Sequence, residues 1–128
     1  MARPIRRNYD IAGAFVMLSG LLHLPLVVLE GWNAQTKFFL IMGLIWIGMG
    51  LWLRGRHRWL AYIAYILVLI GAVINFAAMG NTSIGSWWWL LILIMDFLAI
   101  FHLFKILWAN NPAKAKPVPD AEPVTADE

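Results

Sequence analysis

Four long apolar stretches, joined by connections of only a few polar residues, take up nearly all of this 128-residue chain. A helix rises about 1.5 Å per residue and needs about 20 apolar residues to cross about 30 Å of hydrocarbon, so each stretch is long enough for one crossing. We therefore expect spans at about residues 9–29, 36–53, 59–79 and 87–108. The chain is predicted to be an integral membrane protein.

The composition and the apolar pattern define the fold class. Hydrophobic residues make up 62% of the chain and charged residues 13%, whereas about a quarter of the residues in a soluble domain are charged. No water satisfies peptide groups inside a bilayer, so spans are helices or a closed barrel, and near-continuous apolar runs do not fit the alternating barrel pattern. We expect an all-α polytopic protein with four transmembrane helices in an antiparallel up-down bundle.

The basic residues predict the orientation, because short cytoplasmic loops are enriched in Lys and Arg. Nine of the ten basic residues fall on one side of the predicted spans: Arg3, Arg6, Arg7, Arg54, Arg56, Arg58, Lys105, Lys114 and Lys116. Both termini are therefore expected in the cytoplasm, with residues 1–8 as a basic N-terminal segment and 9–108 as the transmembrane domain. Residues 109–128 are rich in proline and charge, which predicts a disordered tail. Basic residues at membrane edges indicate contact with lipid, not with nucleic acid.

The first apolar run also resembles a secretory signal, since arginines precede it. It is longer than the 7–15 residues of a signal core and ends in Leu29-Glu30-Gly31 without a small-x-small cleavage site, which predicts a retained helix. Aromatic residues at the span ends are typical of interfacial belts. We interpret Trp32 and Trp87–Trp89 as the outer belt, and Tyr9, Trp52, Trp59 and Trp108 as the inner one. The alternative for Trp87–Trp89 is an external ligand site.

Small residues recur at a spacing of seven within three spans. They are Gly13 and Gly20, then Gly43 and Gly50, then Ala64, Gly71 and Ala78. Small residues let helix backbones approach in a membrane, and this spacing puts each set on one face. We expect close packing of helices joined by short loops. The fourth span has only Ala99 as a small residue and is expected to pack more loosely, or to face a partner protein or a second copy of the chain.

Polar side chains within the spans are the candidate functional residues, since they are costly in hydrocarbon and usually face the bundle interior. From the span midpoints at about 1.5 Å per residue, His23 lies about 5 Å outward, Asn75 about 9 Å outward and Asp96 about 2 Å outward. These three residues form the predicted intramembrane cluster. His102, about 7 Å inward, and Glu30, at the outer end of the first span, are secondary candidates.

Asp96 is the strongest candidate, because a carboxylate in hydrocarbon either takes up a proton or finds a cation. His23 is the natural partner, and Pro25 should kink the helix beside it and free the carbonyl of Leu21. Two interpretations stay open. One is a hydrogen bond from His23 to Asp96 that fixes helix register, and the other is a proton relay or polar ligand pocket.

No cofactor, metal or catalytic residue is predicted. His23 and His102 are separated by about 11–12 Å in depth, which argues against a haem between them. His23, Asp96 and Glu30 lack the close spacing of metal ligands, and the chain has no cysteine. It also lacks phosphate-binding loops and catalytic motifs. An enzyme is therefore not favoured, although a lipid- or quinone-modifying enzyme is kept as a third hypothesis.

The layout of the chain resembles that of the DoxX-like small bacterial membrane proteins. The resemblance covers residues 9–108 and rests on the span lengths, on Leu18-Ser19-Gly20-Leu21-Leu22-His23-Leu24 in the first helix, and on Asp96 in the fourth. It implies four helices with short loops in a bacterial inner membrane.

Two functions follow from the sequence as the main alternatives. The first is a non-enzymatic accessory or structural subunit of a membrane complex, with membrane lipids and a partner protein or second copy on the fourth helix. The second is a small proton-coupled transporter, or a bundle that binds lipid or quinone, that uses Asp96 and His23.

Overall fold

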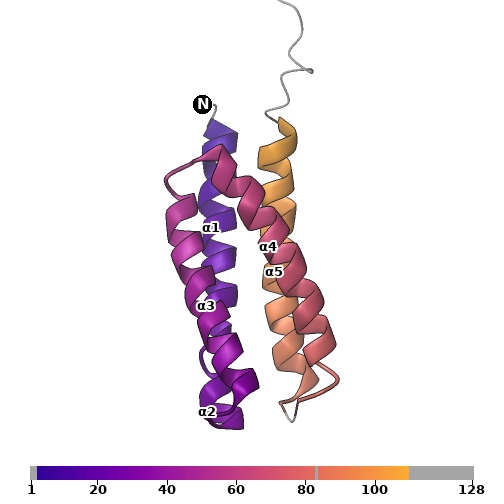
Figure 1. Cartoon of the computed structure of the whole chain (residues 1–128). Coiled ribbons are helices and arrows are strands. Elements are labelled where there is room, and N and C mark those ends of the chain that lie inside the picture. The colour runs from indigo at the N-terminus through magenta and orange to yellow at the C-terminus, as the bar shows by residue number, and fades with distance from the viewer. Residues whose placement is uncertain (1–2, 83, 110–128) are drawn as a thin grey trace, which may run out of the picture.

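The structure, a computed structural model, describes residues 3–82 and 84–109. This part of the chain is helical throughout, with short turns between its elements (Figure 1). The helices are α1 (Arg3–His23), α2 (Leu26–Glu30), α3 (Ala34–Leu53), α4 (Arg58–Ala78) and α5 (Ser86–Ala109). The predicted disordered tail lies outside the described residues apart from Ala109, the last residue of α5. The basic segment before residue 9 belongs to the first helix, because α1 begins at Arg3.

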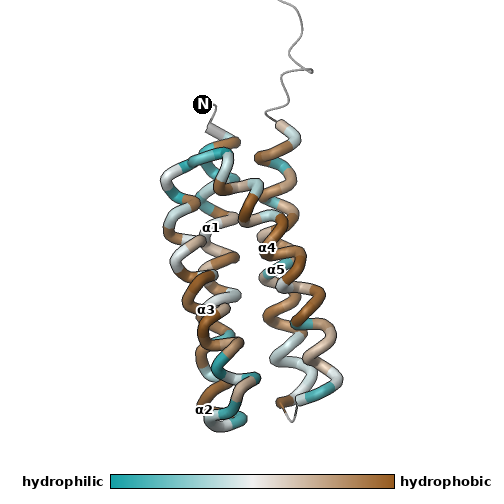
Figure 2. The backbone as a smooth tube through the Cα atoms, in the orientation of Figure 1, coloured by the Kyte–Doolittle hydropathy of each residue, from teal (hydrophilic) through white to brown (hydrophobic). Residues whose placement is uncertain are grey.

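Four helical segments are long and apolar enough to cross a membrane: Pro4–Glu30, Ala34–Leu53, Arg58–Ala78 and Ser86–Ala109. Their outward faces carry large apolar side chains, with Val73 and Phe76 each 65% exposed and Phe97 63% exposed. Hydrophilic colour gathers toward the ends of the molecule and hydrophobic colour between them (Figure 2). Soluble monomers rarely expose an apolar surface of this extent. The protein therefore belongs to the class of multi-pass helical membrane proteins.

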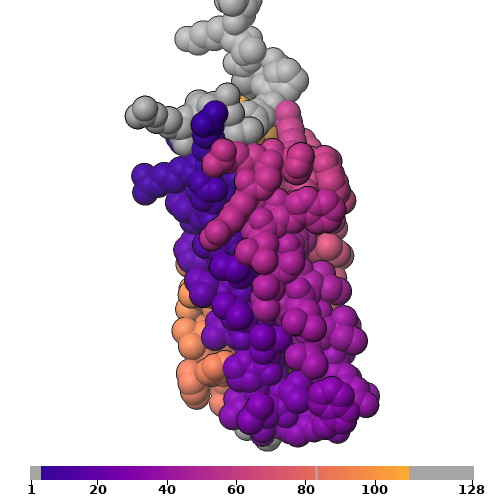
Figure 3. Space-filling view, turned by 90° about the vertical axis from the view of Figure 1, so that its left-hand side faces the viewer, coloured from indigo at the N-terminus to yellow at the C-terminus, as the bar shows by residue number. Residues whose placement is uncertain are grey.

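Glycines bring α1 and α3 into direct backbone contact. A Cβ atom placed on Gly13 would lie 2.6 Å from the carbonyl oxygen of Gly50, and one on Gly20 would lie 2.6 Å from that of Gly43. The helices adjoin along one face of the molecule (Figure 3). These contacts confirm the small-residue faces predicted for the first two spans.

The remaining helices pack differently from the expectation. Helix α5 contacts both α1 and α4, whereas α3 and α4, although joined by a short loop, barely touch. The fourth span is therefore an integral part of the bundle, and the expectation that it packs more loosely than the others, or faces a partner, stays a prediction. The inward face of α5 combines Ala99 with bulky side chains such as Ile92 and Leu103, and all three residues are fully buried.

The gap between α3 and α4 is bridged by a tryptophan. A Cβ on Gly71 would lie 2.7 Å from Cζ2 of Trp46, so the small-residue face of α4 receives an indole ring at this level. Ala64 and Ala78 on the same face are buried. The predicted small-residue face of the third span is therefore buried, but at Gly71 it packs against a side chain and not against a neighbouring backbone.

Pro25 interrupts the first span as predicted, and α2 resumes immediately after it. The Leu21 carbonyl is not free, however, because it accepts a 3.3 Å hydrogen bond from the Leu24 N–H as the chain tightens into a turn. The Leu22 carbonyl accepts a 3.1 Å bond from the indole N–H of Trp88 at the start of α5. The break is therefore satisfied by a local turn and by one neighbouring helix.

Two aromatic residues assigned to the belts are in the core instead. Tyr9 is fully buried and Trp89 is 1% exposed. The indole N–H of Trp89 donates to the Thr82 hydroxyl at 2.7 Å. The polar atom of this side chain therefore has a hydrogen-bond partner inside the protein and does not depend on interfacial water. Five of the predicted belt residues are more than half exposed, as a belt requires: Trp32, Trp52, Trp59, Trp87 and Trp108.

Candidate functional site

Four buried polar side chains form a closed hydrogen-bonded ring between three helices. The Ser19 hydroxyl of α1 donates to Oδ1 of Asp96 in α5 at 2.6 Å, and Nδ2 of Asn75 in α4 donates to Oδ2 of Asp96 at 2.9 Å. His23 of α1 completes the ring, with Nε2 at 3.2 Å from Oδ1 of Asn75 and Nδ1 at 2.7 Å from the Ser19 carbonyl oxygen. We call these residues the polar ring.

The sequence places each member of the polar ring on the inward face of its helix. Ser19 and His23 are four residues apart in α1 and so lie one above the other on a single face. Asp96 lies four residues after Ile92 and three before Ala99, both fully buried, and Asn75 lies four residues after Gly71. The apolar neighbours at helical spacing bury these faces, and the polar residues are carried inward with them.

The ring is sealed from solvent. Ser19, His23, Asn75 and Asp96 are each 0% exposed. The ring of Phe39 from α3 packs against His23 with centroids 5.9 Å apart. Helix α3 therefore covers a site that the other three spanning helices build.

Trp46 of α3 belongs to the same surroundings. Its indole interacts electrostatically with the carboxyl of Asp96, but its N–H falls outside hydrogen-bonding geometry and is buried without a hydrogen-bond partner. The indole N–H of Trp46 is thus a buried donor without a hydrogen bond beside the polar ring.

Hydrogen-bond polarity determines how the ring is protonated in this arrangement. Nδ1 of His23 faces a carbonyl oxygen, which only accepts, and Nε2 faces the amide oxygen of Asn75, which also only accepts. With the Asn75 amide in this orientation both ring nitrogens are donors, which corresponds to the imidazolium form of His23. In the same arrangement Asp96 accepts two hydrogen bonds, which corresponds to a carboxylate, and Asn75 lies between it and His23.

A second arrangement satisfies the same four residues without charges. Rotation of the Asn75 amide by half a turn would direct its NH₂ group to a neutral His23 and its oxygen to a protonated Asp96. The proton lost from Nε2 of His23 is then the proton gained by Asp96. The two arrangements contain the same number of protons and differ in whether His23 or Asp96 holds one of them.

The predicted cluster of His23, Asn75 and Asp96 is brought together by the fold. The direct hydrogen bond from His23 to Asp96, considered from the sequence, is replaced by a link through Asn75. Two contributors were missed, Ser19 and Trp46. Ser19 could have been found from the sequence, since it lies one helical turn before His23 on the same face. Trp46 could not, because tryptophans in this chain are expected at the membrane interfaces.

The secondary candidates lie elsewhere. Nδ1 of His102 faces Oδ1 of Asn8 at 3.2 Å, and Oε1 of Glu30 accepts a 3.2 Å bond from the backbone N–H of Ile84. Neither joins the polar ring. Among the described residues, no group of three or more His, Cys, Asp or Glu side chains could hold a metal ion.

Comparisons with protein-family models, with curated proteins and with solved structures gave no match. The class of the protein is therefore defined by its own fold and site. It is a small helical protein with four membrane-length spans and a sealed polar ring that joins three of them.

Proposed function

We propose that this protein is a non-enzymatic accessory or structural subunit of a bacterial inner-membrane complex. Its four helices cross the bilayer in an antiparallel up-down order, with both termini in the cytoplasm, as the charge bias supports. The DoxX-like layout supports the inner-membrane setting. Lipid surrounds most of the apolar exterior, and a partner protein or second copy contacts the outward face of α5.

The observation that carries this proposal is the closure of the polar ring. Transport or ligand binding needs polar groups that a substrate can reach, but every ring residue is 0% exposed. Each side chain in the ring also finds its partner within the ring or in the adjacent backbone. A sealed and internally satisfied network favours a role in fixing helix register.

Replacement of Asp96 by asparagine separates a structural role from proton handling. The introduced amide would accept from Ser19 and donate to a rotated Asn75 amide, whose NH₂ would then donate to neutral His23, so all four hydrogen bonds persist. We expect Asp96→Asn to restore the phenotype of a deletion strain to the wild-type level. The measurement is complementation at matched protein abundance in the membrane.

Loss of complementation with unchanged abundance would overturn the structural proposal, because the variant can no longer carry a proton. Purification from native membranes in mild detergent is the second test. We expect a protein partner in fixed stoichiometry, and crosslinks that involve α5. A protein that is always isolated alone as a monomer would contradict the accessory role.

A proton-coupled function is the second candidate, and the two arrangements of the ring favour it. A change between these arrangements places one proton on His23 or on Asp96 and reverses the Asn75 amide, and a proton-coupled bundle would use such a pair of states. Nitrogen-15 NMR of labelled His23 in bilayers tests this. Exchange between doubly and singly protonated imidazole would support proton handling, and a single static state would support the structural role.

A further inference from the structure

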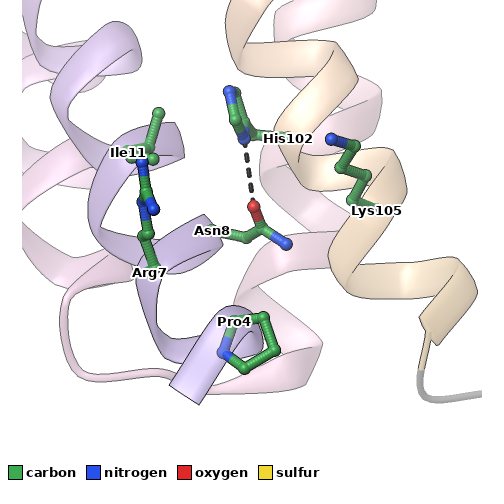
Figure 4. Close-up of a pocket in the computed structure, with 6 residues that line it drawn as sticks. All are labelled: Pro4, Arg7, Asn8, Ile11, His102 and Lys105. Carbon is green, nitrogen blue, oxygen red and sulfur yellow. Dashed lines mark hydrogen bonds between the residues drawn. The ribbon is translucent and has the colours of Figure 1, made fainter. Parts of the chain in front are cut away.

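A basic groove lies between the beginning of α1 and the end of α5, away from the polar ring. Its volume is about 510 Å³ and its lining residues are Pro4, Arg7, Asn8, Ile11, His102 and Lys105 (Figure 4). Arg7 and Lys105 are exposed side chains. Within the described residues no carboxylate lines the groove, and the charged groups that interact with His102 are Lys105 and Arg7. Its charge therefore suits an anion.

The polar groups of the groove are oriented by one another. His102 donates from Nδ1 to Oδ1 of Asn8 at 3.2 Å, which leaves the Asn8 NH₂ group pointing away from His102 (Figure 4). The Phe15 ring stacks on His102 with centroids 5.9 Å apart. The Nζ atom of Lys105 lies 4.3 Å from the Phe101 ring centroid. Aromatic contacts thus hold a histidine and a lysine at the groove, and Asn8 adds a hydrogen-bond donor.

An apolar groove adjoins the basic one. It has a volume of about 310 Å³, shares Pro4, Asn8 and Lys105 with the first, and adds Ile5, Phe104, Trp108 and Ala109. The two grooves together offer cationic donors on one side and an aromatic and aliphatic surface on the other. This pairing matches an amphiphile with an anionic head and a hydrocarbon chain.

We propose that the basic groove binds the phosphate of an anionic glycerophospholipid, whose acyl chain lies along the adjoining apolar groove. A phosphate oxygen accepts charge-assisted hydrogen bonds from Arg7 and Lys105 and a neutral one from Asn8. A phosphocholine head carries the same phosphate but adds a cation, which the two basic side chains would repel. This proposal rests on membrane insertion and is independent of the role of the polar ring.

The test is native mass spectrometry of the full-length protein in neutral detergent with phosphatidylglycerol or phosphatidylcholine. We expect retention of phosphatidylglycerol over phosphatidylcholine, and a loss of about fivefold in apparent affinity for phosphatidylglycerol for each cation removed in Arg7→Gln/Lys105→Gln. The control Arg6→Gln/Arg54→Gln removes two exposed charges that do not line either groove. We expect it to keep the wild-type preference.

An equal loss of preference in both double variants would overturn the proposal, since it would indicate diffuse surface charge. So would a wild-type protein without any preference. Inorganic phosphate, added without lipid, distinguishes the other source of the same chemistry. A rise in melting temperature with millimolar phosphate equal to that with phosphatidylglycerol, and absent in Arg7→Gln/Lys105→Gln, would replace the lipid by a free anion. The Asp96→Asn variant should bind phosphatidylglycerol like wild type, so this test and that of the ring can fail separately.

Discussion

Asn75 sets the polarity of the buried ring, because its amide has one donor end and one acceptor end. With the oxygen toward His23 and the nitrogen toward Asp96, it hydrogen-bonds to both residues at once. An isolated charge at this depth would cost several kcal/mol. A charged pair bridged by an amide has no net charge, and every charged group in it has a hydrogen-bond partner.

Ser19 should contribute measurably to stability. Its hydroxyl is the donor to Oδ1 of Asp96, so Ser19→Ala leaves that oxygen with one donor fewer while the backbone bond to His23 persists. We expect a loss of about 0.5–2 kcal/mol in the free energy of unfolding in mixed micelles. Ser86→Ala, at an exposed position, is the matched control. Equal unfolding curves for the two variants would show that this bond does not stabilise the fold.

At the level of single residues, the sequence identifies the site through polar residues within apolar spans, because such groups are costly in hydrocarbon. It predicted His23, Asn75 and Asp96 as a cluster. It did not predict Ser19, because a hydroxyl can bond to its own helix backbone and is therefore not conspicuous in a span. The bridging position of Asn75 was also not predictable, since it depends on side-chain geometry at the contact of three helices.

Among the helix pairs, α1 and α3 make the closest backbone contact. Gly13 faces Gly50 and Gly20 faces Gly43, so residue numbers rise along one helix as they fall along the other. Since lipid is as apolar as the helices, close van der Waals contact replaces the hydrophobic effect as the source of association. Any side chain at these positions would separate the two backbones.

Replacement by alanine should therefore change the free energy of unfolding differently at two glycines, one packed against a backbone and one in open space. A Cβ on Gly20 meets the backbone oxygen of Gly43 at 2.6 Å, whereas one on Gly48 meets nothing within 4 Å. We expect Gly20→Ala to lower the free energy of unfolding by about 1–3 kcal/mol through overpacking. Gly48→Ala should be neutral or raise it by up to about 1 kcal/mol through helix propensity. Denaturation in mixed micelles measures both, and equal effects would contradict the contact.

The residue spacing predicted the small-residue faces of the helices but not all of their partners. For Gly13 and Gly20 the prediction of a close neighbour is confirmed. For Gly71 the neighbour is the indole of Trp46, because α3 and α4 diverge after their short loop. The spacing of small residues identifies which face of a helix is buried. Whether a backbone or a side chain packs on that face depends on how the helices cross.

As a whole, the spanning helices pack in the order α3, α1, α5, α4, and the polar ring lies where α1, α5 and α4 meet. Helix α3 is attached through α1, and α4 through α5. The ring links α1 to α5 through Ser19 and Asp96, and α1 to α4 through His23 and Asn75, while Trp46 of α3 contacts Gly71 of α4. The ring therefore adds directional hydrogen bonds to the packing of α1, α4 and α5.

The class of the whole molecule could be predicted from the sequence, because bilayer thickness dictates the length of an apolar span. All four predicted spans correspond to helices of membrane length. The pairing of helices could not be predicted in the same way, since every span is apolar on most of its faces. It depends on a few positions, namely the glycines of α1 and α3 and the residues of the ring.

The most direct test of the polar ring as a structural lock is the thermal unfolding of Asp96→Asn and Asp96→Leu in lipid nanodiscs, with wild type alongside. Asparagine keeps all four hydrogen bonds after rotation of Asn75, whereas leucine, of similar size, strands the buried Ser19 hydroxyl and one end of the Asn75 amide. We predict that Asp96→Asn stays within about 0.5 kcal/mol of wild type and that Asp96→Leu is destabilised by about 1–3 kcal/mol. Equal stability of the two variants would contradict the account.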